Sequence, residues 1–125
     1  VKRLAIEDKV EFVGSVTDLK KKINVMSNSS VFALCSESEG MPQALVEAMS
    51  LGKLVVGSNN EGIREVIQDE RFLFPVGDHK KLKEKLEFVF KNFKTLDEEM
   101  SKNRAKTQEF KWDEIVEQIE KVYNS

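Results

Sequence analysis

The stretch SESEGMPQALVEAMSLGKLVVGS, residues 36–58, predicts a loop, a helix, a turn and a strand in succession. It follows the apolar run 31–35, which has the composition of a buried strand. Pro42 falls where the first turn of a helix tolerates proline, and Gly52 falls just after the helix, where a left-handed cap favours glycine. The run 54–56, Leu-Val-Val, then predicts a second buried strand. Strand, helix and strand in this order imply a parallel sheet with a right-handed crossover.

Two glutamates occupy polar positions of this unit. Glu39 lies in the loop, and Glu47 lies on the helix stripe opposite the apolar face. The helix N-terminus beside Gly40 offers backbone N–H groups that can bind an anion. Carboxylates can also accept hydrogen bonds from the hydroxyls of a ribose or a hexose. The alternatives are a Glu39 that only favours the helix N-terminus electrostatically and a Glu47 that is an ordinary exposed residue.

A larger set of motifs surrounds these glutamates: Glu-Gly-Met-Pro at 39–42, Glu47-Ala48-Met49, Gly52, Val55-Val56 and Glu61-Gly62-Ile63-Arg64-Glu65. Together they resemble the retaining glycosyltransferases of family 4. These enzymes have the GT-B architecture of two Rossmann-like domains. The resemblance covers part of the C-terminal, nucleotide-sugar-binding domain, from about Val10 to the region of Phe110, Trp112 and Tyr123. It implies an α/β fold, a Rossmann-like parallel sheet with helices on both faces, for the whole chain 1–125, with a C-terminal helix at about 112–123.

The resemblance also implies roles for the residues that carry it. Glu39 would lie near the hydroxyls of the donor sugar and is the candidate catalytic residue. Gly40, Met41 and Pro42 would pass under the sugar and the diphosphate. Glu47 would accept hydrogen bonds from the ribose hydroxyls of the nucleotide.

Two further candidates for the donor site are Gly14 and Glu65, whose roles the resemblance leaves undefined. The family stabilises the diphosphate leaving group with an arginine and a lysine that precede anything matching Val1. We do not assign that role to Arg64, which stands where the family varies. We therefore expect residues 1–125 alone to transfer no sugar. The resemblance implies no metal and no cofactor, with a nucleotide-diphosphate sugar as the donor substrate.

The implied function is transfer of a sugar from a nucleotide-diphosphate sugar to an acceptor with retention, in polysaccharide or glycoconjugate biosynthesis. This chain would be the donor-binding part, and a glycan or lipid-linked sugar acceptor would bind through an N-terminal domain. Two alternatives stay open: a non-catalytic nucleotide-sugar-binding or scaffold module of the same fold, and another GT-B enzyme such as a phosphorylase or an epimerase. We expect a cytoplasmic protein. A peripheral association of the full-length protein with the inner face of the membrane is compatible with that location.

Composition is typical of one globular domain. The chain has 125 residues, of which 40% are hydrophobic, and its 20 basic residues nearly balance 22 acidic ones. This balance argues against nucleic acid as a partner. A single cysteine excludes an internal disulfide. There is no apolar stretch long enough to span a bilayer and no signal-peptide pattern at Val1.

Outside the central unit, hydrophobic spacing predicts the remaining elements. Strands are expected at 10–13 and 72–74, in addition to 31–35 and 54–56, and helices at 19–26, 63–67, 80–93, 96–110 and 112–123. Asp18 or Thr17 would cap the first of these helices, and the lysines at 20–22 would form a solvated face. Cys35 is expected to be a buried structural thiol and His79 a surface residue.

Glycines mark one edge of the predicted sheet. Of the six glycines, all but Gly52 fall in loops that leave the carboxyl end of a predicted strand, which is where ligands bind open parallel sheets.

The family orders its six strands 3-2-1-4-5-6, and this chain would carry only the third to the sixth. Residues 10–13 would then be separated from residues 31–35 by a gap of two strands. Either the first strand moves beside the second, or a partner chain fills the gap in a homo-oligomer, or the missing strands lie elsewhere in the protein.

Overall fold

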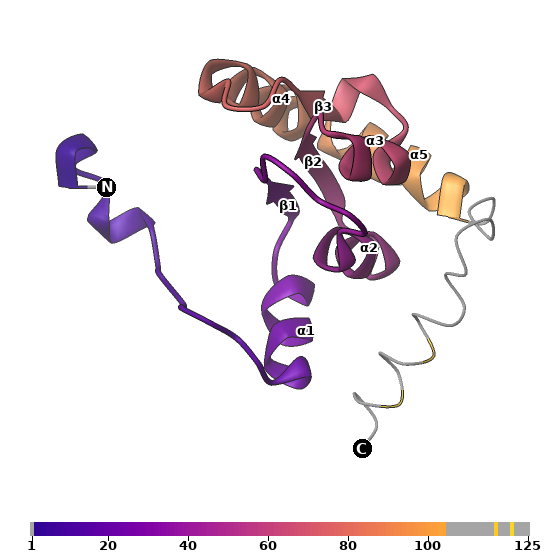
Figure 1. The fold of residues 1–125 in the computed structure, drawn as a ribbon, viewed down its shortest axis with the longest axis horizontal. Coiled ribbons are helices and arrows are strands. Elements are labelled where there is room, and N and C mark those ends of the chain that lie inside the picture. The colour runs from indigo at the N-terminus through magenta and orange to yellow at the C-terminus, as the bar shows by residue number, and fades with distance from the viewer. Residues whose placement is uncertain (1, 105–116, 118–120, 122–125) are drawn as a thin grey trace.

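The computed structural model describes residues 2–104, 117 and 121. Its elements, shown in Figure 1, are the 3₁₀ turns η1 (Lys2–Leu4), η2 (Glu7–Lys9) and η3 (Glu70–Phe72), the strands β1 (Val31–Leu34), β2 (Leu54–Ser58) and β3 (Leu73–Phe74), and the helices α1 (Leu19–Ser27), α2 (Gln43–Ser50), α3 (Glu61–Ile67), α4 (His79–Lys91) and α5 (Phe93–Arg104). No helix in this described part is long and apolar enough to cross a bilayer.

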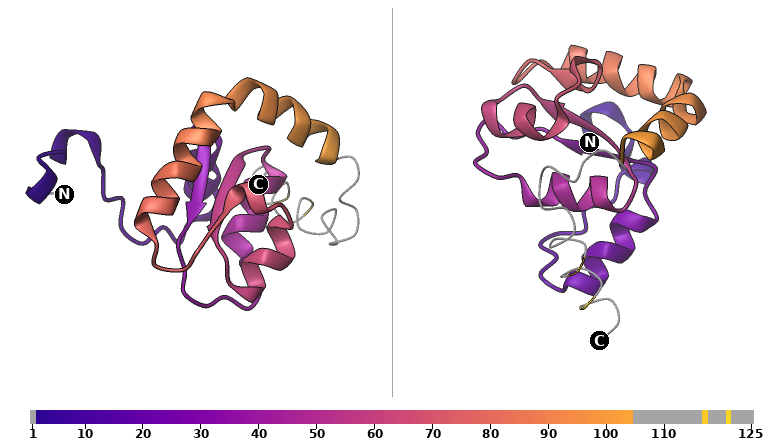
Figure 2. Two further views of the ribbon diagram at one scale, coloured as in Figure 1. Left: turned by 90° about the horizontal axis from the view of Figure 1, so that it is seen from above. Right: turned by 90° about the vertical axis from the view of Figure 1, so that its right-hand side faces the viewer.

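The three strands form a parallel sheet in the order β1-β2-β3. Val31 pairs with Leu54, and Gly57 pairs with Leu34 on one side and Leu73 on the other. Helices α2 and α3 cover one face of the sheet, and α4 and α5 cover the other (Figure 2). This arrangement confirms the predicted α/β, Rossmann-like fold with helices on both faces.

The core is centred on β2, whose five residues are all buried. Apolar side chains from both helical layers pack on it, chiefly Leu45, Val46, Ile63, Ile67, Val89 and Leu96. Burying these side chains stabilises the folded state by about 25 cal/mol for each Å² of apolar surface removed from water. The middle strand is therefore the part of the sheet that is held most firmly.

Short-range signals at the helix ends are confirmed. Asp18 Oδ1 accepts a hydrogen bond of 3.1 Å from the Lys20 amide at the start of α1. Gly52 follows α2 with a φ of 81°, a left-handed conformation that glycine adopts without strain. The predicted helix at 96–110 is present as α5 as far as Arg104. Its remainder and most of the predicted helix at 112–123 lie outside the described residues.

The predicted strand at 10–13 is wrong. These residues are extended but pair with no strand of the described sheet, and Phe12 keeps 81% of its surface exposed. Figure 1 shows the indigo N-terminal segment lying apart from the sheet. A strand forms only when its backbone finds a pairing partner, and local sequence does not supply one. Of the three outcomes considered for the gap, the structure excludes a strand at 10–13 paired beside β1.

The expectation of full cover for residues 31–35 is also wrong. β1 is an edge strand, so Ala33 is exposed and the other residues of β1 are only half-buried. Cys35, expected to be buried, has an exposed thiol for the same reason. Its partial burial still raises the pKa of the thiol above its usual value, which lowers the thiolate fraction at neutral pH.

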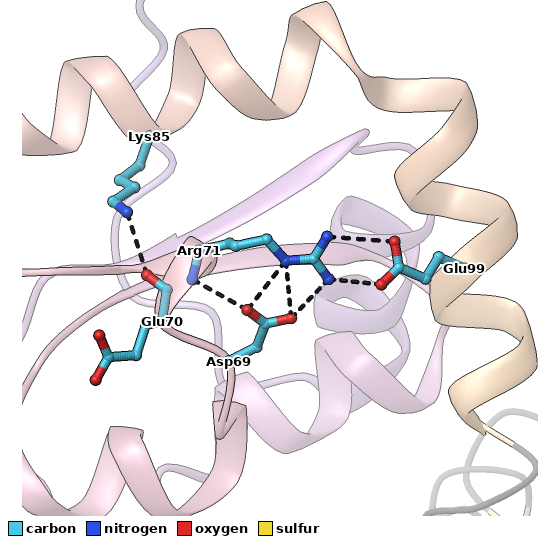
Figure 3. A network of polar contacts seen from close by, with 5 residues as sticks. All are labelled: Asp69, Glu70, Arg71, Lys85 and Glu99. Atoms are coloured by element: carbon cyan, nitrogen blue, oxygen red, sulfur yellow. Dashed lines mark hydrogen bonds and ion pairs between the residues drawn. The ribbon is translucent and has the colours of Figure 1, made fainter.

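Helix α5 is tied to the turn before β3 by a network of charged groups around Arg71 (Figure 3). Its guanidinium lies 2.6 Å from Glu99 Oε1 and 2.8 Å from Asp69 Oδ2, and it stacks over the Phe72 ring at 5.4 Å. The hydrogen bonds from Arg71 lower the pKa of both the Asp69 and the Glu99 carboxyls. These ion pairs therefore add to the packing of Leu96, which is buried in the core, in holding the last described helix on the domain.

We predict that Arg71→Gln lowers the unfolding midpoint at pH 7 by about 1–3 °C, a small change because exposed ion pairs contribute little. A carboxylate with a depressed folded-state pKa contributes stability above its unfolded pKa and loses it as pH falls through the folded value. The difference between wild type and variant should therefore be full above about pH 4.5 and shrink below about pH 4. Thermal unfolding at a series of pH values measures it. A difference that did not change with pH would contradict the ionic origin.

Candidate functional site

The loop 35–42 joins the carboxyl end of β1 to the N-terminus of α2, and it carries most of the predicted site. The connection from β2 to α3 runs beside it at the same edge of the sheet, where ligands bind parallel α/β folds. Leu34, the last residue of β1, pairs with Gly57, so the loop after β1 begins beside Ser58, the last residue of β2. The Ser58 hydroxyl lies against Ser36 of that loop.

Glu39 is oriented by its own loop. Ser36 Oγ donates a hydrogen bond of 2.6 Å to Glu39 Oε1, and the Glu39 side chain is half-buried. The Ser36 carbonyl in turn accepts two hydrogen bonds, one from the hydroxyl of the fully buried Ser58 and one of 2.9 Å from Asn60 Nδ2. The carboxylate therefore projects from a loop that is anchored to β2 and to the start of α3.

Asn60 connects the loop to α3 through both ends of its amide. While Nδ2 donates to the Ser36 carbonyl, Oδ1 accepts a hydrogen bond of 3.0 Å from the Ile63 amide and caps the helix. Two residues after the cap, Gly62 lies against the backbone of the loop. A Cβ atom at Gly62 would lie 2.2 Å from the Glu39 carbonyl oxygen and 2.4 Å from that of Gly40.

This contact changes the interpretation of the glycines. Gly62 lies in α3 and Gly57 in β2, and a Cβ atom at Gly57 would meet the Ile63 and Ile67 side chains. Both were expected in loops facing a ligand, whereas the structure needs them because helix, strand and loop approach one another closely. Gly40 remains in the site loop with open space around it.

We predict that Gly62→Ala destabilises the fold by about 2 kcal/mol or more, because the new methyl group meets backbone carbonyls that cannot rotate away. Gly40→Ala is the matched control, since nothing lies within 4 Å of its added Cβ. Chemical denaturation of both variants measures the difference. Equal stabilities would show that α3 does not press on the loop as described.

The start of α2 is open to a ligand. Gly40 and Met41 are exposed, Met41 by 55%, while Pro42 is buried and stands immediately before the helix. Pro42 occupies the N-cap position, and its side chain makes no hydrogen bond to the helix. In the first turn the Gln43 amide donates to the Met41 carbonyl at 2.9 Å, so the Ala44 and Leu45 amides are the donors left for an anion.

Glu47 forms an ion pair with Lys22, one of the three lysines that were predicted to form a solvated helix face. Lys22 of α1 is only 31% exposed, and its Nζ lies 2.8 Å from Glu47 Oε2, in a side chain that is 15% exposed. That oxygen is buried, and within the described residues no donor, Lys22 included, meets it in hydrogen-bond geometry. The ion pair therefore positions the Glu47 carboxylate through Oε2.

Two of the predicted site residues are not brought to this loop. Gly14, with a φ of 76°, lies in the extended segment between η2 and α1 and has no neighbour within 4 Å of an added Cβ. Glu65 is exposed on α3, and within the described residues its carboxylate has no hydrogen bond or ion pair. Arg64 donates a hydrogen bond of 3.2 Å to Asn59.

Four residues of the site were missed: Ser36, Ser58, Asn60 and Lys22. Ser58 and Asn60 fall between the strand predicted at 54–56 and the helix predicted at 63–67, although an asparagine before an apolar helical pattern is a common N-cap signal. The contacts of Ser36 and Lys22 join segments distant in sequence, and no local pattern indicates them.

Comparison with known proteins gives consistent similarities. The family model described as glycosyl transferases group 1 matches residues 1–108. The chain is 34% identical, over 98% of its length, to N-acetyl-alpha-D-glucosaminyl L-malate synthase of Bacillus anthracis, of which it covers 32%. It is 25% identical over 94% of its length to an uncharacterized glycosyltransferase of Haemophilus influenzae, covering 33% of that protein. It is 26% identical over 96% of its length to one of the subunits of phosphatidylinositol N-acetylglucosaminyltransferase of Arabidopsis thaliana, covering 26% of it. The chain thus spans a third or less of these relatives.

Proposed function

Because the chain belongs to the group 1 glycosyltransferases, we propose that it forms the donor-binding part of an enzyme that transfers a sugar from a nucleotide-diphosphate sugar to an acceptor. We further propose that transfer proceeds with retention, as the family 4 resemblance implies. The observation that carries the proposal is the loop 35–42, which presents the Glu39 carboxylate beside an uncapped helix N-terminus.

The two ends of a nucleotide sugar fit the two halves of this site. The first turn of α2 offers N–H groups for diphosphate oxygens, and the helix dipole favours their negative charge. Glu39, fixed by Ser36, would hold the sugar hydroxyls near the reacting carbon. Glu47, in the second turn of the same helix, would accept a hydrogen bond from a ribose hydroxyl.

The names of the relatives suggest which donor substrate to test first. Two of the three are named for N-acetylglucosaminyl groups, so a nucleotide-diphosphate N-acetylglucosamine is the donor that we propose to try first. The acceptor would be a glycan or a lipid-linked sugar, in polysaccharide or glycoconjugate biosynthesis, bound through another domain. A cytoplasmic location, peripheral contact with the membrane, self-association and catalysis without a metal or cofactor stay predictions.

We predict that Glu47→Ala, in the complete protein that contains this chain, weakens binding of a nucleoside diphosphate by roughly 10- to 100-fold. Losing hydrogen bonds to a charged acceptor costs about 1.5–3 kcal/mol. Isothermal titration calorimetry measures it, with Glu87→Ala as the control because that glutamate is exposed on α4, on the opposite face of the sheet. An unchanged dissociation constant would remove Glu47 from the site.

We predict that Glu39→Gln lowers turnover more than it weakens binding of the donor. The amide keeps the size of the side chain but removes the charge that would act on the sugar as the diphosphate leaves. Steady-state rates with labelled nucleotide sugars, set against calorimetric affinities, separate the two effects. Equal losses in rate and affinity would make Glu39 a helix-end carboxylate. A wild-type protein that binds the donor but transfers nothing would favour the scaffold alternative.

A further inference from the structure

We propose that Asn60 is a positioning residue for Glu39, acting through the Ser36 carbonyl. The inference rests on the proposed function, because it concerns the carboxylate that would meet the donor sugar. It starts from the two hydrogen bonds of the Asn60 amide: Oδ1 to the Ile63 amide at 3.0 Å and Nδ2 to the Ser36 carbonyl at 2.9 Å.

The helix cap alone does not explain an amide at this position. Serine and aspartate cap helices about as well as asparagine does, because a cap needs only a side-chain oxygen that accepts. The second hydrogen bond needs a donor at the far end of the same side chain. Asparagine supplies the acceptor and the donor together, whereas aspartate has no donor and serine is too short to reach both partners. The Nδ2 contact is thus the part of Asn60 that serves the loop.

From Ser36 the effect passes to Glu39 by one further contact. Ser58 and Asn60 fix the peptide group of Ser36 from two directions. Fixing the backbone of Ser36 also fixes the position of its side chain, whose Oγ donates a hydrogen bond of 2.6 Å to Glu39 Oε1. On the opposite side of Glu39, its carbonyl rests against Gly62. The carboxylate is therefore held between β2 and α3, and its position follows theirs.

Small errors in position matter for transfer. A displacement of about 1 Å of a group that acts on the substrate can cost up to about 100-fold in rate. Loss of one of the two hydrogen bonds on the Ser36 carbonyl should shift the loop by less than that. We therefore expect a reduction of about 10-fold in kcat without a matching change in the KM for the donor.

The test compares Asn60→Ser with Asp78→Ser in the complete protein. Both variants keep a residue that can cap a helix, but Asp78 caps α4, on the other face of the sheet from the loop. Hydrogen–deuterium exchange reports on loop 35–42, and steady-state kinetics with a nucleotide-linked N-acetylglucosamine reports on transfer. Asn60→Ser should speed exchange in the loop and lower kcat by about 10-fold, with KM changed by less than about 3-fold. Asp78→Ser should do neither.

A double variant separates positioning from general loosening. In Ser36→Ala the hydroxyl that holds Glu39 is gone, so adding Asn60→Ser should lower kcat little further, in a clearly non-additive cycle. Ser58→Ala, which removes the other donor to the same carbonyl, should reproduce the effect of Asn60→Ser. These comparisons hold even if Asn60→Ser is also less stable.

The inference is overturned if loop exchange in Asn60→Ser matches wild type, if kcat is unchanged despite faster exchange, or if the double variant is additive. A wild-type protein that transfers no sugar from any nucleotide donor would overturn the proposed function instead. In that case the exchange rates alone would still decide whether Asn60 holds the loop.

Discussion

The contact between the start of α3 and the backbone of loop 35–42 is the constraint on which the site depends. Loops at the edge of a sheet are usually the mobile part of a domain, yet this one is fixed by two donors on one carbonyl and by the absence of a side chain at Gly62. Ser58 ends β2, and Asn60 lies in the connection from β2 to α3. Parallel pairing of β1 with β2 is what places that connection beside the loop, so the geometry of Glu39 is set by sheet register.

The same register explains how stability and function are divided in the domain. β2 is buried along its whole length and carries the helices of both layers. Its carboxyl end supplies Ser58, which is buried and polar but fully used as a donor. On the far side, α4 and α5 pack on the sheet, and Arg71 pairs with Glu99 of α5. The buried strand β2 thus ends at Ser58, whose hydroxyl holds the backbone of loop 35–42.

Sequence predicted the parts of this structure that local chemistry determines. The cap at Asp18, the left-handed turn at Gly52 and the spans of the helices follow from signals within a few residues. The parallel sheet followed from the order of the elements. The strand at 10–13 failed because pairing depends on a partner that the local pattern does not contain. Cys35 failed because exposure depends on which strand lies at the edge.

In the candidate site, too, local sequence indicates some residues, and only the tertiary structure shows the others. Motif and helix spacing single out Glu39 and Glu47 as candidates, but no local pattern indicates the residues that contact them. Lys22 precedes Glu47 by a full strand and loop, and only the packing of α1 near α2 brings their charges to 2.8 Å. An ion pair buried to this degree adds little net stability, since the loss of hydration offsets most of the attraction. Its effect falls instead on the carboxylate: Lys22 holds Oε2 of Glu47, so α1, which precedes β1, takes part in positioning a candidate site residue.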